Sequence, residues 1–197
     1  MDRERFKKQT DFILELDKEK SIFRQTHLTG HGRNENDAEH AWHMAIMAWL
    51  LREYSNVKVD IAKVMLMCLI HDVVEIDAGD TYAYDSEGLK TQSEREEKAA
   101  DRIFGILPPD QGEKLRNLFE EFEANETPEA RFAHVMDNFQ PILLNDSNKG
   151  TDWIPHGISA SQVRERQKRA QNGSDEIYAY IQKLIQKHVD EGHLKNN

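Results

Sequence analysis

Cysteine is almost absent from this sequence, since Cys68 is the only one among 197 residues. A single cysteine excludes a framework of disulfide bonds and favours a reducing compartment, so we expect a cytoplasmic protein. Long apolar runs are missing too, because no stretch approaches the roughly 20 apolar residues of a membrane-spanning helix. The charged segment at residues 2–8 does not resemble a signal peptide. We therefore expect no membrane partner.

An excess of positive charge is also lacking. Lysine and arginine together number 26 against 36 aspartates and glutamates, which gives a formal net charge of -10. Neither terminus carries a basic run, and binding to the phosphate backbone of a nucleic acid depends on such charge. The composition therefore argues against a nucleic-acid polymer as a partner.

Internal repeats, linkers and strand-like alternation are absent as well. Residues that begin and end helices recur at intervals that suit an all-α bundle. A length of 197 residues fits one domain with a substantial core. We predict a single all-α domain over residues 1–197, with the functional core at about residues 23–144 and C-terminal helices at about residues 159–191.

Capping residues predict where the helices begin. In chain order, the predicted N-terminal caps are Asp37, Asp60, Ser93 with Glu96, Thr127 before Pro128, Ser159 with Gln162, and Ser174. The helix that follows Asp60 is predicted to continue until Gly79. By contrast, residues 20–36 are predicted to be irregular, and residues 81–92 to form an exposed loop that could serve as a lid.

The most informative stretch is residues 65–80, where an apolar run typical of a buried helix contains the adjacent pair His71 and Asp72. Burying such ionisable groups is costly unless a strong partner compensates, and a bound metal cation is such a partner. On a helix, Glu75 would lie one turn beyond His71 on the same face. There it would face whatever the ion holds.

Two further ionisable residues interrupt apolar stretches of other predicted helices, His40 in residues 37–54 and Asp137 in residues 129–145. Two imidazoles with two carboxylates suit a divalent transition ion such as Mn, Co, Fe, Ni or Zn better than Ca or Mg, which prefer oxygen ligands alone. We therefore predict a site for one such ion with four ligands: His40, His71, Asp72 and Asp137.

These residues belong to three longer motifs: Arg33-x-Glu35-Asn36-x-x-Glu39-His40, His71-Asp72-x-x-Glu75-x-x-x-Gly79-Asp80, and Asp137-Asn138. Together the motifs resemble the H…HD…D signature of the HD-domain metal-dependent phosphohydrolases, an all-helical superfamily in which four such residues bind one divalent ion. The resemblance covers about residues 23–144 and is closest to the branch that contains the 5′-deoxyribonucleotidases. It implies an HD-domain helical bundle.

The resemblance also implies roles for residues around the predicted ion. It implies a catalytic glutamate at Glu75, an auxiliary catalytic acid at Asp80 and an arginine that grips phosphate at Arg24. Arg33, from the first motif, is a second predicted substrate-binding residue. The sequence departs from this branch at Gln25, where the deoxyribonucleotidases carry a tryptophan after the arginine. A strict preference for deoxy sugars is therefore not implied.

The predicted activity is hydrolysis of the phosphomonoester of a nucleoside or deoxyribonucleoside 5′-monophosphate, or of a similar small phosphate ester. A bound transition ion lowers the pKa of its water and polarises a phosphoryl oxygen. Glu75 would then move protons of that water, while Asp80 would orient it or protonate the leaving alcohol. Two alternatives stay open. One is hydrolysis of nucleoside polyphosphates or alarmone pyrophosphates, and the other is a metal-bearing or nucleotide-sensing module without turnover.

Two aromatic residues indicate a further partner. Trp42 and Trp49 share one stripe of the helix predicted at residues 37–54. Such a stripe is typical of packing, here against a second subunit. The resemblance also implies a homodimer, because relatives are commonly dimeric.

Overall fold

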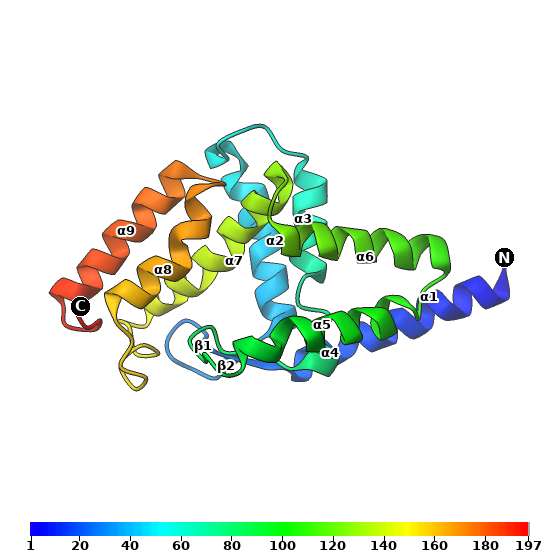
Figure 1. Cartoon of the computed structure of the whole chain (residues 1–197), viewed down its shortest axis with the longest axis horizontal. Coiled ribbons are helices and arrows are strands. Elements are labelled where there is room, and N and C mark those ends of the chain that lie inside the picture. The colour runs from blue at the N-terminus through cyan, green and yellow to red at the C-terminus, as the bar shows by residue number, and fades with distance from the viewer. Residues whose placement is uncertain (197) are drawn as a thin grey trace.

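The computed structural model describes residues 1–196 and shows a bundle of helices with one small hairpin of strands (Figure 1). The helices are α1 (Arg3–Leu16), α2 (Asp37–Leu51), α3 (Ile61–Ile70), α4 (Glu75–Ala78), α5 (Leu89–Phe104), α6 (Pro109–Ala124), α7 (Pro128–Ser147), α8 (Ala160–Gln171) and α9 (Asp175–Asp190). The strands are β1 (Phe23–His27) and β2 (Asn34–Asn36), and short 3-10 helices are η1 (Asp17–Ser21) and η2 (Arg52–Tyr54). The prediction of an all-α fold is confirmed. None of the described helices is long and apolar enough to cross a membrane.

Helix α7 runs through the middle of the fold, with α2 and α3 on one side and α8 and α9 on the other (Figure 1). Its apolar side chains join those of its neighbours in one continuous buried cluster, which includes Phe132 and Met136 of α7, Met44 of α2 and Met67 of α3. Burying a large apolar side chain contributes about 1.5–3 kcal/mol. The cluster therefore fixes α2, α3 and α7 relative to one another.

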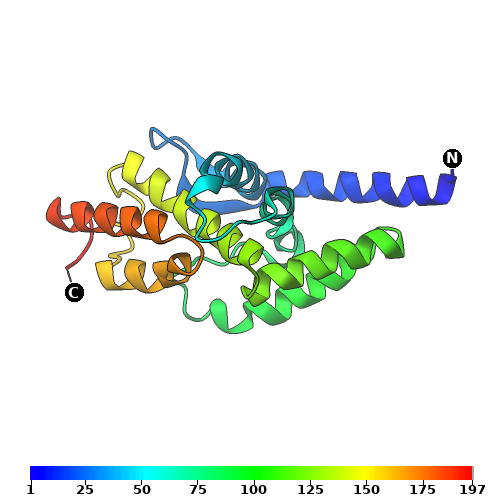
Figure 2. The ribbon, with the colours of Figure 1, turned by 90° about the horizontal axis from the view of Figure 1, so that it is seen from above.

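Helices α1, α5 and α6 extend away from this centre on the side of the N-terminus (Figure 2). Nη1 of Arg5 in α1 lies 2.6 Å from Oδ1 of Asp110 at the start of α6. Nη2 of Arg102 in α5 lies 2.7 Å from Oε1 of Glu15 in α1. These ion pairs join the N-terminal helix to the segment that follows the His71-Asp72 pair.

The prediction of an irregular segment at residues 20–36 is wrong. β1 pairs with β2 as an antiparallel hairpin, in which Phe23 lies opposite Asn36 and His27 opposite Asn34, with an irregular register between these pairs. Nδ2 of Asn34 donates to the carbonyl oxygen of Arg24 at 2.7 Å. Because such polar contacts hold the strands, neither strand needs the alternation of apolar residues that announces a strand in sequence.

The helix that carries His71 and Asp72 is also shorter than predicted. α3 ends just before His71, residues 71–74 form turns, and the short α4 then ends at Gly79, whose φ is 74°. Several N–H groups in this stretch bond three residues back, as Glu75 N does to Asp72 O at 2.8 Å, whereas an α-helix uses four. This tightening means that the helical spacing assumed for His71 and Glu75 does not apply.

The predicted cap of α2 is displaced by one residue. Asn36, and not Asp37, is the N-cap, because its side chain accepts from the backbone N of Glu39 and the Glu39 carboxylate accepts from the backbone N of Asn36. Asp37 is the first helical residue and is buried. The caps predicted for α3, α7, α8 and α9 are confirmed: Asp60, Thr127 with Pro128, Ser159 with Gln162, and Ser174.

The capping box predicted for α5 is wrong, because α5 begins one turn earlier and Ser93 and Glu96 lie inside it. The Glu96 carboxylate accepts instead from Nε2 of Gln92 at 2.6 Å. The turn before the helix is closed by Asp85, whose Oδ1 accepts from the backbone N of Gly88 at 3.1 Å. The exposed loop is therefore shorter than predicted, and its role as a lid stays a prediction.

Candidate metal centre and its cleft

Side chains from α2, α7 and the turn after α3 meet at the centre of the fold. Nε2 of His40 lies 3.3 Å from Oδ1 of Asp137, and Nε2 of His71 lies 3.9 Å from the same oxygen. Nε2 of His71 lies 3.1 Å from Oδ2 of Asp72. His40, His71 and Asp72 each offer one ligand atom, and these three atoms lie within 4.8 Å of one another. The structure thus brings together all four residues that were predicted to bind metal.

Both imidazoles are held through their Nδ1 atoms. Nδ1 of His71 lies 3.0 Å from the carbonyl oxygen of Cys68, which can only accept. Nδ1 of His40 lies 3.0 Å from Oε1 of Gln140, while Nε2 of Gln140 donates to Oε1 of Glu35 at 2.6 Å. Such partners fix the tautomer of a metal-binding histidine and aim its Nε2 lone pair at the ion.

Among the four candidate ligands, one buried side-chain atom lacks a hydrogen-bond partner. Nε2 of His71 makes no hydrogen bond within residues 1–196, although Oδ2 of Asp72 is close to it. A buried polar atom without a partner costs free energy, and a cation bound to its lone pair would remove that cost. The orphaned nitrogen and the set of two imidazoles and two carboxylates both fit a divalent transition ion.

The charges of the centre keep the two ligand carboxylates ionised. Burial opposes ionisation of Asp137, but the hydrogen bond with His40 and the charge of His71 lower its pKa well below the ordinary value. Burial also opposes ionisation of Asp72, yet the charges of His71 and Arg24 lower its pKa. Against burial, the charge of Asp72 raises the pKa of His71 to about 9, so a cation that binds Nε2 has to displace a proton from it. Both carboxylates are therefore anionic and suited to a cation.

A second acidic group lies beside these ligands. It consists of Asp37, Glu75 and Asp80. Each offers one carboxylate oxygen, and these three oxygens lie within 4.8 Å of one another. Burial, and then the charges of Asp72 and Asp37, raises the pKa of Glu75 strongly, and burial raises the pKa of Asp80. Oε2 of Glu75 is buried without a hydrogen-bond partner among the described side chains. Glu75 is therefore a group with a high affinity for a proton.

Arg24 of β1 joins the two acidic groups. Its Nη1 lies 2.6 Å from Oδ2 of Asp72 and 3.4 Å from Oδ1 of Asp37. The guanidinium offsets part of the negative charge that Asp37, Glu75 and Asp80 add to the ligand carboxylates. Three of the residues predicted to act on substrate, Arg24, Glu75 and Asp80, thus lie at the centre.

Arg33 does not lie at this centre. Its guanidinium bonds both carboxylate oxygens of Glu39, and its side chain is 53% exposed. It lines neither of the two cavities at the centre. The position of Arg33 therefore gives no support to its predicted role in substrate binding.

A cleft of about 730 Å³ opens onto the centre. Its walls include His71, Asp72 and Asp137, and residues of the loop before α5, of α5, of α6 and of α8 complete the lining. Sites for small molecules typically have volumes of about 300–1,000 Å³. A second cavity shares Arg24 and Asp80 with the cleft and continues outward along Gln25, Thr26, Tyr82, Tyr84, Asp152 and Trp153.

Sequence reasoning missed the arginines of α8. Arg166 lines both cavities and Arg169 lines the cleft. Within the part of the chain that the structure describes, no hydrogen bond or ion pair engages either guanidinium. The sequence shows only two arginines three residues apart on a basic helix, a pattern that suits a solvated face equally well. Gln140 was also missed, although a polar residue within the apolar stretch of α7 is the same kind of signal as Asp137.

The fold and this centre define a class of protein, in which a helical core gathers two histidines and two carboxylates beside an open cleft. A family model described as HD domain matches residues 16–178. The chain belongs to the HD domain family, as its motifs predicted.

Individual relatives agree with this assignment. The protein named 5′-deoxynucleotidase HDDC2 from Homo sapiens is 31% identical over 111 residues, which cover 56% of this chain and 53% of that protein. The 5′-deoxynucleotidase hdd1 from Schizosaccharomyces pombe is 30% identical over 118 residues, which cover 57% of this chain and 58% of that protein. The chain thus spans little more than half the length of the curated relatives that it matches.

A solved structure is similar over nearly the whole chain. It is the crystal structure described as a predicted metal-dependent phosphohydrolase from Magnetospirillum magnetotacticum MS-1, with 47% sequence identity and a TM-score of 0.93. The match covers 96% of this chain and 95% of that chain. The helical fold around the centre is therefore shared with that protein.

Proposed function

We propose that this protein is a metal-dependent phosphohydrolase that releases phosphate from nucleoside 5′-monophosphates, deoxyribonucleotides included. The observation that supports the proposal is the convergence of the four predicted metal ligands at a cleft that three of them line, His71, Asp72 and Asp137, together with the unpaired arginines of α8. The names of the two 5′-deoxynucleotidases support the substrate class, and the description of the similar crystal structure supports metal dependence.

We propose that one divalent transition ion, with Mn, Co, Fe, Ni and Zn as candidates, is held by four residues: His40, His71, Asp72 and Asp137. When bound, such an ion lowers the pKa of a water molecule and polarises a phosphoryl oxygen. The two histidines are oriented for this role, because the contacts of their Nδ1 atoms with Cys68 and Gln140 leave both Nε2 atoms facing the centre.

Glu75 is proposed to move protons to and from the nucleophilic water. Its Oε2 atom is buried without a hydrogen-bond partner in the described chain, and its side chain lines the same cleft as the ligand Asp72. General acid and base catalysis of this kind contributes a factor of about 10²–10⁴. Asp80, in the same acidic group, is proposed to orient the water or to protonate the leaving alcohol.

Arg24 and Arg166 are proposed to hold the phosphate of the substrate. Both line the cleft and the second cavity, and they come from different elements, β1 and α8. Hydrogen bonds from arginine to phosphate oxygens are among the strongest in proteins because both partners are charged. Arg169 of α8 lines the cleft but not the second cavity, and it adds positive charge next to Arg166.

The second cavity, of about 80 Å³, is proposed to take part of the sugar or base, with the rest of the nucleoside in the cleft. Tyr82 and Tyr84 lie on its wall with their ring centroids 5.4 Å apart, and aromatic rings of this kind can stack on a base. Gln25 lines the same cavity, at the position where the resembling deoxyribonucleotidases carry tryptophan. We therefore propose that the cavity accepts a sugar with a 2′-hydroxyl as well as a deoxy sugar.

A panel of nucleotides tests the function. Chelator-treated protein, reloaded with Mn or Co, is incubated with ribonucleoside and deoxyribonucleoside mono- and polyphosphates, and the released products are measured. We expect inorganic phosphate from the monophosphates only when the metal is present. Pyrophosphate released from polyphosphates would support the polyphosphate alternative, and nucleotide binding without turnover would support a sensing module.

We further propose that two copies of the chain pair through α2. Trp42, Ile46 and Trp49 follow one another at helical spacing, and they are 63%, 42% and 50% exposed. Exposed aromatic residues gathered on one stripe are typical of protein interfaces. Light scattering should give twice the chain mass of 22.9 kDa, and Trp49→Glu should restore the mass of one chain.

Two predictions about organisation also stay proposals. We propose that residues 1–197 form one domain, because a continuous cluster of buried side chains reaches from Phe12 in α1 to Leu194 after α9. The cytoplasmic location rests on the single cysteine, Cys68, which is a free and buried thiol. Limited proteolysis and cell fractionation, respectively, test these two proposals.

A further inference from the structure

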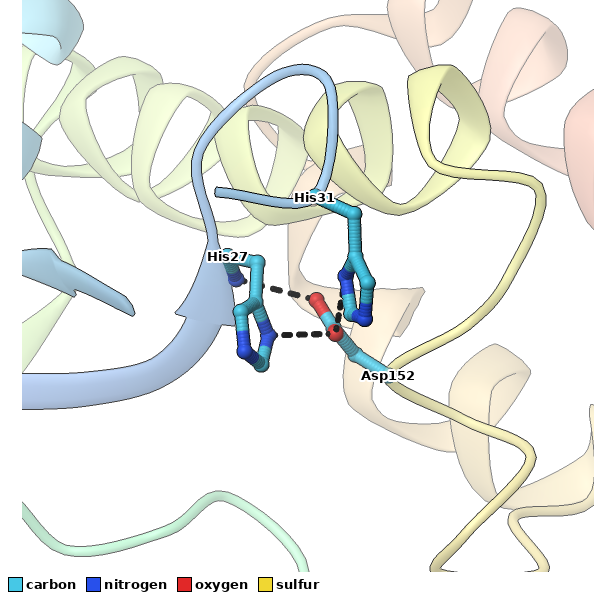
Figure 3. Close-up of side chains that lie close together, drawn as sticks. All are labelled: His27, His31 and Asp152. Carbon is cyan, nitrogen blue, oxygen red and sulfur yellow. Dashed lines mark hydrogen bonds and ion pairs between the residues drawn. The ribbon is translucent and has the colours of Figure 1, made fainter. Parts of the chain in front are cut away.

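Away from the candidate metal centre, two histidines and an aspartate meet where the hairpin contacts the loop after α7 (Figure 3). His27 ends β1, His31 lies in the turn of the hairpin, and Asp152 lies in the loop. Nδ1 of His27 and Nδ1 of His31 lie 2.7 Å and 3.8 Å from the same oxygen, Oδ1 of Asp152. The centroids of the two rings are 4.3 Å apart. Nδ1 of both histidines, from the hairpin, thus approaches one oxygen of Asp152, from the loop after α7.

The backbone around this cluster is fixed by polar contacts. Oδ2 of Asp152 accepts from the backbone N of His27 at 3.0 Å, which leaves Oδ1 to face the rings. The buried Asn148 accepts from the backbone N of His31 at 2.9 Å and donates to the carbonyl oxygen of Leu28 at 3.0 Å. The φ of His31 is 53°, a left-handed conformation that is uncommon outside glycine. Such conformations persist only where neighbouring contacts impose them, and they gather at functional sites.

Hydrogen bonding accounts for only part of this arrangement. The ring of His27 is already at hydrogen-bond distance from Asp152, whereas the ring of His31 stands farther off with its Nδ1 directed at the same oxygen and 3.3 Å from Oγ1 of Thr151. One atom of each of these three side chains lies within 4.8 Å of the other two. Two imidazoles and a carboxylate are a donor set that suits a divalent transition ion. Metal bonds of about 2.0–2.2 Å place donor atoms roughly 3 Å apart, so small ring movements would suffice.

Another histidine cluster in the chain shows the contrast. Nδ1 of His188 lies 2.9 Å from Nδ1 of His193, and Nε2 of His188 lies 3.0 Å from Oδ1 of Asp146. Lys187 also pairs with this oxygen of Asp146 at 2.7 Å. Because both ring nitrogens of the buried His188 have partners, that cluster is explained as a link between α9 and the end of α7. In the cluster at His27 and His31, by contrast, hydrogen bonds among the described residues engage only Nδ1 of each ring, with Asp152 and Thr151 respectively.

We propose that His27, His31 and Asp152 form a second metal site, for a borderline divalent ion such as Zn(II). The side chains of the two histidines are 27% and 49% exposed, so solvent can complete the coordination. The hairpin and the loop both line the second cavity, through Thr26 next to His27 and through Asp152 itself. An ion bound here fastens the two segments together and thereby steadies the outer wall of that cavity.

Zinc binding to the full chain tests this proposal. Chelator-treated protein is titrated with Zn(II), and the equivalents bound are counted by calorimetry and by elemental analysis after desalting. We expect two equivalents for the wild type, one for His31→Ala, one for His71→Ala and none for the double variant. His156→Ala, a change in the same loop but outside the cluster, should keep two equivalents.

The two metal sites are distinguished by these variants. Equal binding by the wild type and His31→Ala would overturn the second site, whereas loss of the equivalent that depends on His71 concerns only the proposed function. A second measurement does not depend on stoichiometry: nitrogen NMR of the histidine rings should show that Zn(II) shifts Nδ1 of both His27 and His31. Unchanged resonances of these two atoms would also overturn the proposal.

Discussion

Oε1 of Gln140 lies 3.0 Å from Nδ1 of His40, and both side chains are fully buried. This contact joins the middle of α7 to α2 and leaves Nε2 of His40 facing Asp137. The other end of the amide is held by Glu35, so the imidazole is oriented by a chain of two hydrogen bonds. The position of one candidate ligand therefore depends on a residue that never faces the cleft.

Gln140→Ala is expected to weaken metal binding by about 10- to 100-fold, because partners that orient a metal-binding histidine have effects of this size. Calorimetric titration of chelator-treated protein with Mn or Zn measures the change. Gln167→Ala is the matched control, since it removes a buried amide of α8 that bonds the carbonyl oxygen of Asn138 at 3.2 Å. Equal affinities for Gln140→Ala and the wild type would contradict the orienting role.

Glu75→Gln is expected to lower kcat by about 10²–10⁴ while the metal content is unchanged, because the amide keeps the shape but cannot take up the proton. Phosphate release and elemental analysis are measured on the same sample. Asp77→Asn is the control, since this carboxylate of α4 pairs with Arg102 at 2.8 Å and does not line the cleft. Retained activity in Glu75→Gln would exclude the proton-transfer role.

Arg166→Gln is expected to raise KM for nucleoside monophosphates. Hydrogen bonds to charged groups contribute about 1.5–3 kcal/mol, which corresponds to about a tenfold to hundredfold change. Arg164→Gln lies on the same helix and loses only the bond to Gln186 at 3.1 Å, so its KM should stay at the wild-type value. If the two variants behaved alike, Arg166 would be a surface charge without a role in substrate binding.

Glu19 in η1 should make the stability of the metal-free protein depend on pH. Burial, and then the charges of Asp72 and Asp37, raises its pKa to about 8, above the value of about 4.3 for an exposed glutamate. Between these values the folded state keeps a proton that the unfolded state has released. The free energy of unfolding should therefore be highest below the unfolded pKa and fall as the pH rises toward the folded pKa.

Glu19→Gln should flatten this decrease, because the amide does not titrate. Urea denaturation of chelator-treated protein between about pH 5 and pH 8 measures the slope. Glu53→Gln, which changes an exposed glutamate of the other 3-10 helix, η2, should keep the wild-type slope. Identical slopes for Glu19→Gln and the wild type would contradict the assignment.

Features set by local chemistry could be predicted from the sequence. The caps at Asp60 and Ser174 were found because a side chain there bonds a backbone N–H two or three residues on. The hairpin at Phe23 to Asn36 was missed because distant residues such as Asn148 help to hold it. The break after α3 was missed because His71 and Asp72 look helical in isolation.

Only part of the candidate site could be predicted from the sequence. His40, His71, Asp72 and Asp137 stand out because each interrupts an apolar stretch, and a buried charge needs a partner. Arg166 stands out only after α8 is placed across the cleft, since its neighbours in sequence are charged as well. Arg33 was selected by its place in a motif, yet it points to solvent and pairs with Glu39.

Asp137 and Gln140 project from α7 between side chains such as Phe132 and Met136, which are completely buried. A protein engineer who wished to graft this centre onto a foreign scaffold would have to carry α2, α3 and α7 across as one block. Random mutagenesis aimed at new chemistry will meet the same constraint, because changes in α7 put foldability at risk together with metal affinity. The exposed residues of the loop before α5 are where this chain can accept sequence diversity at the lowest risk.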